Sequence, residues 1–270
     1  MEREPSMEIV VGKKGVGKSY LTKQQIDSYV MNDPSTGRSG RPVLVIDTTG
    51  EYSDYKTVYF DIEEKNELIR ARNIIKIKAP IKYRILCFKK NGQPMNVNEI
   101  VTTVSTAAKF FRNGLLVLED INKYILHSVR VDIVGLLVSI RHLGVDLILH
   151  YQAARKIPPT MWQNCNFLRM HKQIETVDVF RNRVPDFEII KLSEFVVNRR
   201  YESGDYHYCC WVAIEDSYVV NVSEEDWKQA CKDYFFTYPK DVRRYLAVAK
   251  NNREQALQKF IEEKIKYVRN

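Results

Sequence analysis

The sequence predicts an α/β fold around a mostly parallel sheet, for two reasons. Short runs of β-branched and other apolar residues alternate with segments of helical spacing, a pattern typical of parallel sheets. The chain has 270 residues, of which 44% are hydrophobic, so it is long enough to bury a large core. The expected core strands are Glu8–Val11, Val43–Asp47, Leu115–Glu119, Asp146–Tyr151 and Asn166–His171.

Further elements are expected between and beside these strands. Helices are predicted at Val97–Phe111 and Asp132–His142, each leading into the next core strand. Shorter outer strands are predicted at Lys56–Phe60, Ile74–Lys78 and Arg84–Phe88. These additions widen the sheet beyond its five core strands.

The pattern changes after residue 192. Phe195–Arg200 and Tyr206–Ile214 flank the turn-like sequence Glu202–Asp205, which predicts a C-terminal β-hairpin. Ser223, followed three residues later by Asp226, is typical of a helix N-terminus. A helical extension should therefore follow the hairpin.

The last part of the chain carries an apolar stripe at helical spacing, which favours core packing or a partner contact over a cofactor site. The stripe consists of Leu257, Phe260, Ile261, Ile265 and Val268. We expect an N-terminal arm over residues 1–7, a main domain over 8–221 and a C-terminal helical extension over 222–270.

A complete phosphate-binding loop lies directly after the first predicted strand. Residues 12–19 read GKKGVGKS, which matches the pattern G-x-x-x-x-G-K-[ST]. In this pattern Lys18 neutralises the β- and γ-phosphates and the Ser19 hydroxyl binds Mg²⁺. The helix predicted after the loop adds its positive N-terminal end to anion binding. The nucleotide-binding residues are therefore expected to be Gly12, Lys13, Lys14, Gly15, Val16, Gly17, Lys18, Ser19 and Tyr20.

Two adjacent acids follow the third core strand. Hydrolysis of a phosphate needs a carboxylate to hold the metal and a base to orient the attacking water. Ligands gather at the carboxyl ends of parallel strands, where Glu119 and Asp120 are expected to lie. By position Glu119 takes the metal role and Asp120 the water-activating role, although the reversed order of Glu and Asp leaves this division open. Gln152, after the fourth core strand, is a candidate sensor of the γ-phosphate.

Composition adds broad limits on partners and compartment. The net charge of +8 suits an anionic partner, either nucleic acid or a membrane surface. No apolar stretch reaches the length of a membrane-spanning helix, and the N-terminus lacks a signal-peptide core. The five cysteines show no metal-binding spacing and are expected to be reduced thiols. We expect a cytoplasmic protein without membrane insertion.

Three segments together resemble the FtsK/HerA superfamily of DNA-pumping ATPases. The sequence Asp47–Tyr52, DTTGEY, looks like the Asp-x-x-Gly-Glu-Tyr segment of HerA-type proteins. Arg141–Gln152 looks like the helix, turn, fourth strand and terminal Gln of the family, and Ile157–Asn166 resembles the segment before the fifth strand. The resemblance covers roughly residues 8–172. The compact chain is most similar to the viral genome-packaging branch.

The resemblance implies a RecA-like P-loop ATPase domain with core strand order 5-1-4-3-2, using ATP and Mg²⁺. It also implies a homo-oligomeric ring, usually a hexamer, that moves double-stranded DNA through its pore, with a viral capsid or portal-vertex protein as a further partner. An arginine finger that reaches the ATP of a neighbouring subunit is implied as well. Arg141 is our candidate for this finger, and Arg155 is the second choice.

Several basic clusters could contact DNA phosphates. They are Lys13–Lys14, Lys89–Lys90, Arg199–Arg200 and Lys240–Lys250, which contains Arg243 and Arg244. Arg199–Arg200, near the expected hairpin tip, is the first choice. Three functions remain open: a genome-packaging motor, a conjugative or other HerA-type DNA-processing ATPase, and a small-molecule kinase or nucleotide-dependent switch protein.

Overall fold

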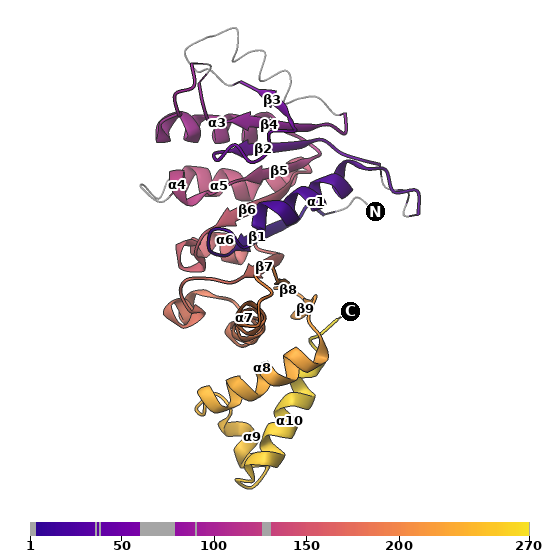
Figure 1. Cartoon of the computed structure of the whole chain (residues 1–270), viewed down its shortest axis with the longest axis vertical. Coiled ribbons are helices and arrows are strands. Elements are labelled where there is room, and N and C mark those ends of the chain that lie inside the picture. Colours follow the sequence, from indigo (N-terminus) through magenta and orange to yellow (C-terminus); the bar gives the residue numbers. More distant parts are fainter. Residues whose placement is uncertain are drawn as a thin grey trace. The chain divides into compact units, whose positions relative to one another are not determined.

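The computed structural model describes residues 4–35, 37, 39–59, 79–89, 91–125 and 131–269. Nine strands form one mostly parallel sheet in the order β3-β4-β2-β5-β6-β1-β7-β8-β9 (Figure 1). The strands are β1 Met7–Val11, β2 Val43–Asp47, β3 Lys56–Val58, β4 Lys82–Leu86, β5 Leu115–Leu118, β6 Asp146–Tyr151, β7 Phe167–His171, β8 Cys209–Ala213 and β9 Tyr218–Val220. The α-helices are α1 Lys18–Val30, α3 Val97–Phe110, α4 Asn122–Ile125, α5 Val131–Ser139, α6 Pro159–Gln163, α7 Phe187–Glu202, α8 Glu224–Thr237, α9 Arg243–Val248 and α10 Arg253–Ile265. The 3-10 helices are η1 Ile140–Leu143, η2 Ala154–Lys156 and η3 Val177–Arg183.

The predicted fold class is confirmed. The five expected core strands appear as β7-β1-β6-β5-β2 in the sheet, which is the predicted order 5-1-4-3-2. The pairs of β2 with β4 and β5, and of β5 with β6, are parallel. β8 and β9 are added in antiparallel fashion. The carboxyl ends of β2, β5 and β6 therefore point to the same edge of the sheet.

The chain divides into two compact units. The first contains Met1–Val10 and Gly17–Gln152, and the second contains Val11–Val16 and Ala153–Asn270. The phosphate loop thus begins in the second unit and ends in the first.

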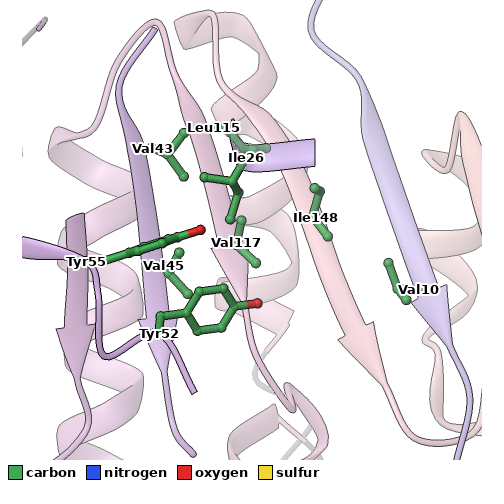
Figure 2. Close-up of a cluster of buried hydrophobic side chains, with 9 residues drawn as sticks. All are labelled: Val10, Ile26, Val43, Val45, Tyr52, Tyr55, Leu115, Val117 and Ile148. Atoms are coloured by element: carbon green, nitrogen blue, oxygen red, sulfur yellow. The ribbon is translucent and has the colours of Figure 1, made fainter. Parts of the chain in front are cut away.

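A buried cluster in the first unit joins α1 to the sheet (Figure 2). Ile26 of α1 packs with alternate residues of β2 and β5, and all of these side chains are buried. Alternate residues of a strand point to the same face, so α1 covers one face of this part of the sheet. Burial of each such side chain contributes about 1.5–3 kcal/mol. This packing fixes the start of α1, and with it Lys18 and Ser19, beside the strand ends.

The C-terminal helices of the second unit enclose an aromatic core. Phe260 of α10 stacks on Tyr234 and lies edge-on to Tyr245 of α9. Trp227 is fully buried, and its indole N–H donates to the carbonyl of Lys264 at 2.9 Å. The predicted cap at Ser223 is confirmed, because its side chain accepts a hydrogen bond from the backbone of Asp226. The apolar stripe of α10 is thus used partly for core packing.

The predicted hairpin around Glu202–Asp205 is wrong. Phe195–Arg200 lies within α7, which starts with the Asp186 side chain as its cap and ends near Gly204, where φ is +99°. The apolar residues of this segment continue a helical spacing that begins upstream, so a short window misread a helix as a strand. The real hairpin joins β8 to β9 through residues 214–217.

Other boundaries differ by small amounts. The helix predicted at Asp132–His142 is α5 followed by the 3-10 turn η1, and the outer strand predicted at Arg84–Phe88 begins two residues earlier as β4. The strand predicted at Ile74–Lys78 lies outside the described residues. None of the helices in the described part of the chain is long and apolar enough to span a membrane.

Candidate functional site

The second unit holds the first half of the phosphate loop. A Cβ atom at Gly12 would lie 2.7 Å from the Cβ of His171, so the chain needs glycine at this close approach. The backbone N–H of Lys13 donates to the carbonyl of Lys172 at 2.9 Å, and its Nζ donates to the Tyr201 hydroxyl at 2.6 Å. Gly15 has a φ of +84°, with open space where a side chain would stand. The loop is therefore anchored to β7 and α7 at its start and open at its tip.

The first unit holds the second half of the loop and the start of α1. Gly17 adopts the left-handed conformation (φ 82°, ψ 14°) and caps α1, and its carbonyl accepts the first helical bond, from Leu21. Lys18 and Ser19 therefore occupy the first turn, where backbone N–H groups lack helical partners and the helix dipole is positive. This geometry suits an anion.

Glu119 lies at the end of β5, buried to 4% exposure. Its Oε1 accepts a hydrogen bond from the Tyr52 hydroxyl at 2.6 Å and lies 3.1 Å from His150 Nδ1. Burial alone would raise the pKa of Glu119, but the charge and hydrogen bond of His150, with hydrogen bonds from Tyr52 and Ser19, lower this pKa to about 2. Glu119 is thus a buried carboxylate that stays ionised beside the Ser19 hydroxyl.

His150 links β6 to both sides of the site. Its Nε2 lies 2.8 Å from the Thr22 hydroxyl, and Thr22 lies one turn after Ser19 on α1. Because the other ring nitrogen faces Glu119, the imidazole fixes the carboxylate of β5 relative to α1. Both His150 and Thr22 are buried.

Two of the predicted site residues, Asp120 and Gln152, lie together in the first unit. Gln152 Nε2 donates to Asp120 Oδ1 at 2.8 Å. Asp120 has a φ of +47°, an uncommon value for a residue other than glycine, and the following N–H of Ile121 donates to the carbonyl of His150. Asp120 is partly exposed and its partner Gln152 is exposed, whereas Glu119 is buried. The two acids therefore differ in environment.

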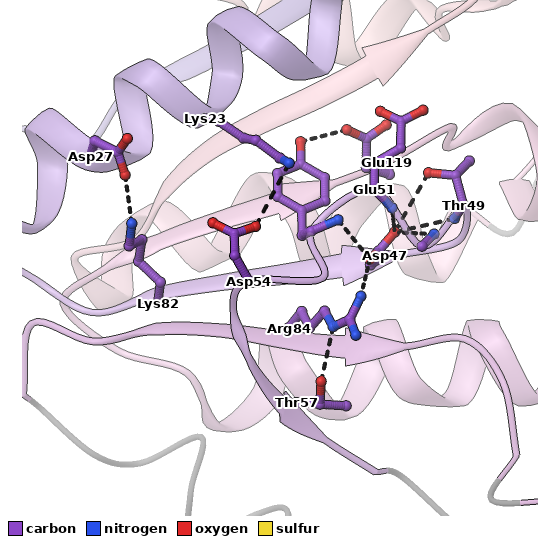
Figure 3. A network of polar contacts seen from close by, with 12 residues as sticks. Lys23, Asp27, Asp47, Thr49, Glu51, Asp54, Thr57, Lys82, Arg84 and Glu119 are labelled. Carbon is purple, nitrogen blue, oxygen red and sulfur yellow. Dashed lines mark hydrogen bonds and ion pairs between the residues drawn. The ribbon is translucent and has the colours of Figure 1, made fainter.

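A second buried acid, Asp47, organises the segment after β2 (Figure 3). Its two oxygens accept hydrogen bonds from the backbone N–H groups of residues 49–52, and Oδ2 lies 3.1 Å from Arg84 Nη1. This cradle sets the position of Tyr52, whose hydroxyl reaches Glu119. Asp47 thus supports the site through Tyr52.

The two arginine-finger candidates have different surroundings. Arg141 is half-buried in η1, where its Nε donates to the carbonyl of Pro5 at 3.1 Å. Arg155 in η2 is 51% exposed and lies 2.9 Å from Glu175. Both would have to leave these partners to reach a neighbouring subunit.

The basic pair expected at a hairpin tip is instead part of α7. Arg199 forms an ion pair with Asp233, and Arg200 Nη2 lies 2.5 Å from Asp226, both acids of α8. These arginines join two helices of the second unit. The reason for expecting a DNA contact at this pair, its place at a hairpin tip, therefore no longer holds.

Sequence reasoning missed three residues that surround Glu119. Tyr52 stood within the quoted Asp-x-x-Gly-Glu-Tyr segment, so its place in the motif was a signal. His150 precedes Gln152 by two positions on the same strand, and side chains two apart share a face. Thr22 gave no signal, because its helical spacing from Ser19 is shared by many residues.

Comparisons with known proteins agree with this fold. No family model and no curated protein sequence matches the chain. Among solved structures, it is similar to the DNA-packaging ATPase B204 from Sulfolobus turreted icosahedral virus, with a TM-score of 0.52 and 15% identity over 80% of this chain and 97% of that one. The genome-packaging NTPase B204 from Sulfolobus turreted icosahedral virus 2, in complex with AMPPCP, gives a TM-score of 0.52 and 14% identity over 80% and 96%.

At this identity the similarity shows the fold. The expected resemblance to viral genome-packaging ATPases is confirmed at that level, and the chain has the α/β fold of these P-loop NTPases.

Proposed function

We propose that the protein is a Mg²⁺-dependent ATPase that moves double-stranded DNA, in the role of a viral genome-packaging motor. The single observation that carries the proposal is the buried carboxylate of Glu119 at the end of β5, which has Tyr52 and His150 as partners and lies in the same unit as Ser19 at the start of α1. A complete phosphate-binding sequence leads into that helix. The fold similarity to packaging ATPases supports the choice of motor.

Binding of ATP would use the loop and the first turn of α1. Lys18 supplies a positive charge for the β- and γ-phosphates, and the glycines let the backbone N–H groups approach them. Tyr20, 66% exposed, lies next to this turn and is available to the rest of the nucleotide. These residues would orient the γ-phosphate toward the strand ends.

Magnesium fits the donors present. The cation prefers oxygen ligands and often takes a carboxylate together with substrate phosphates. Ser19 and Glu119 would hold it, since one offers a hydroxyl and the other a carboxylate that remains charged in a buried position. The metal would neutralise charge on the phosphates.

Hydrolysis would depend on Asp120 and Gln152. Asp120 is less buried than Glu119 and would accept a proton from the attacking water. Gln152, which donates to Asp120, would contact the γ-phosphate and change partner when the phosphate leaves. Arg141 would stabilise the transition state from a neighbouring subunit of a ring, with Arg155 as the second choice.

The proposal also includes two partners, duplex DNA and a viral capsid or portal-vertex protein. The net charge of +8 suits a phosphate backbone. A hexameric ring in the host cytoplasm or virion, contacting a capsid or portal-vertex protein, would package the genome. A conjugative or HerA-type DNA-processing ATPase would use the same site and DNA contact.

The test is the rate of phosphate release from ATP with and without duplex DNA, together with the mass of the assembly. We expect a ring-sized mass and faster hydrolysis with DNA. Hydrolysis unaffected by DNA in a monomer would contradict the motor and favour the switch protein. Transfer of the γ-phosphate to a small-molecule acceptor would identify a kinase.

A further inference from the structure

The cations of the second unit differ in whether they have an acidic partner. Arg181, Arg199 and Arg200 each form an ion pair with an acid of the same unit. Lys191 and Lys264 are buried and paired with glutamates. These side chains join helices to one another and are occupied within the fold.

Three exposed cations of the same unit lie close together in the sequence, and none of them has an ion pair or side-chain hydrogen bond within the part of the chain that the structure describes. They are Lys240, Arg243 and Lys250, which we call the α9 basic surface. They lie in α9 and in the two connections beside it. Figure 1 shows α9 beside α10 and below α8 in the C-terminal group of helices.

The sequence around this surface is strongly positive. Residues 240–253 contain five basic residues and one acid, Asp241. The carboxylate of Asp241 is already engaged, because its Oδ2 lies 2.7 Å from Arg181 Nη2 and accepts from the Tyr234 hydroxyl at 2.8 Å. The positive charge of the surface is therefore not neutralised by the acid beside it.

The packing of α9 directs this charge outward. Val242, Tyr245 and Ala249 are buried and recur at helical spacing, so they form the inner face. Arg243 and Val248 lie on the exposed side. A helix that enters a membrane surface needs a wide apolar outer face, whereas Val242, Tyr245 and Ala249 face inward here and Val248 is the exposed large apolar side chain of α9.

Lys250 lies in a turn of uncommon backbone conformation after α9. Lys250 and Asn251 both have positive φ values, 48° and 65°. This conformation favours glycine or asparagine and is uncommon for lysine. The turn thus places the lysine at a position where glycine would be less strained. Strained backbone positions of this kind are found more often at functional sites.

We propose that the α9 basic surface binds the phosphate backbone of duplex DNA. Arg243 begins the six-residue helix α9, with Lys240 three residues before it and Lys250 two residues after the end of the helix, and duplex DNA carries a charge about every 1.7 Å, so these cations would contact several phosphates. The contact is independent of sequence, because it involves phosphates alone. This inference rests on the proposed DNA-moving function and adds its contact surface.

The test is binding to a short labelled duplex at several salt concentrations. The variant carries Lys240→Gln, Arg243→Gln and Lys250→Asn, and asparagine suits the positive φ of residue 250. We expect affinity to fall about 10-fold or more, and the slope of log affinity against log salt to lose about 2 to 3 units.

A matched control removes the same net charge elsewhere. Lys109→Gln, Lys228→Gln and Lys266→Gln combine exposed lysines of α3, α8 and the segment after α10. This control should bind DNA nearly as the wild-type chain does. Equal losses of DNA affinity in both triple variants would overturn the inference, because binding would then depend on net charge alone.

The remaining outcomes are also decisive. Thermal unfolding checks that each variant folds, and Arg243→Glu alone replaces the triple variant if that one is unstable. A wild-type chain that binds no duplex at any salt contradicts the DNA-moving function itself. Binding to phosphatidylserine–phosphatidylcholine vesicles that the α9 variant abolishes, without duplex binding, overturns the inference in favour of a membrane contact.

Discussion

Two glutamates, Glu119 in the first unit and Glu194 in the second, are equally buried at 4% exposure and have opposite surroundings. Glu194 lies 2.5 Å from Lys191 Nζ on the same helix and also accepts from the backbone of Val177. Glu119 accepts instead from the Tyr52 hydroxyl and lies beside His150 at a strand end.

The difference separates a structural carboxylate from a candidate chemical one. The lysine beside Glu194 neutralises its charge within the helix, so this pair serves the fold. The partners of Glu119 are a hydroxyl and an imidazole, which lower the pKa of its carboxyl against the effect of burial, and this is the carboxylate proposed above to hold a metal. Changes in the first unit should therefore affect chemistry, and changes at Glu194 and Lys191 should affect stability.

The largest effect is expected from Lys18→Ala. Loss of the charge on the β- and γ-phosphates should lower the hydrolysis rate by about 10³-fold, while the temperature of unfolding changes little. Steady-state phosphate release measures the hydrolysis rate, and thermal unfolding measures the temperature of unfolding. Near-normal turnover would contradict the phosphate-loop assignment.

Arg141→Ala should bind ATP almost normally and hydrolyse it about 10³-fold more slowly. Because the proposed finger acts on the ATP of a neighbour, mixing Arg141→Ala with Lys18→Ala protein should restore some activity at interfaces with one intact Lys18 and one intact Arg141. Mixed rings that stay inactive at every ratio would exclude Arg141 as a finger and make Arg155 the next residue to test.

Lys191→Met tests the structural role of the ion pair between Lys191 and Glu194 in the second unit. It leaves Glu194 buried without its cation, which should cost about 3–5 kcal/mol in free energy of unfolding. Denaturant unfolding measures the loss, and Lys191→Met combined with Glu194→Leu should recover most of it. A double variant as unstable as the single one would show that the pair itself, and not the unpaired charge, provides the stability.

Changes at Asp120 and at Glu119 should affect different steps of the ATPase cycle. Asp120→Asn should slow single-turnover hydrolysis about 10²-fold and retain ATP affinity, since it removes the proposed base. Glu119→Gln should weaken Mg²⁺-dependent nucleotide binding instead. Affinity and single-turnover rates of each variant decide the roles, and the opposite outcome would mean that the two residues have exchanged them.

The smallest effect is expected from Tyr52→Phe. Loss of one hydrogen bond to a buried carboxylate should cost about 1–3 kcal/mol of stability at neutral pH. Because the folded-state pKa of Glu119 lies below its ordinary 4.5, its contribution to stability is present above that value and is lost as pH falls toward about 2. The variant should lose less stability over this window. Unfolding measured from pH 5 to lower values (roughly the span of these two pKa values) tests this, and an unchanged pH profile would remove Tyr52 from the support of Glu119.

The sequence allowed the core strands and the phosphate loop to be predicted because their signals are local. β2 and β6 occur at the predicted residues, and Asp120 and Gln152 meet as expected of neighbouring strand ends. The network around Glu119 was harder to predict from the sequence, because Thr22 and His150 come into contact only through the packing of α1 on the sheet. Spacing along a single element does not encode such a contact.

The C-terminal half was predicted less well for a related reason. Phe195–Arg200 has the β-branched and aromatic content of a strand, but burial against α8 and β8 selects a helix that starts at the Asp186 cap. The ion pairs of Arg199 and Arg200 with acids of α8 could not be predicted from the sequence either. Only the folded arrangement separates these occupied arginines from the exposed cations of the α9 basic surface.

The most direct test of the proposed motor is displacement of a third strand from duplex DNA. A motor that moves along the duplex should release a bound triplex-forming strand in the presence of ATP and Mg²⁺. We expect release by the wild-type protein and none by Lys18→Ala. DNA-stimulated hydrolysis by the wild-type protein without any strand release would contradict the central claim, because the chain would then bind DNA and hydrolyse ATP without moving along the duplex.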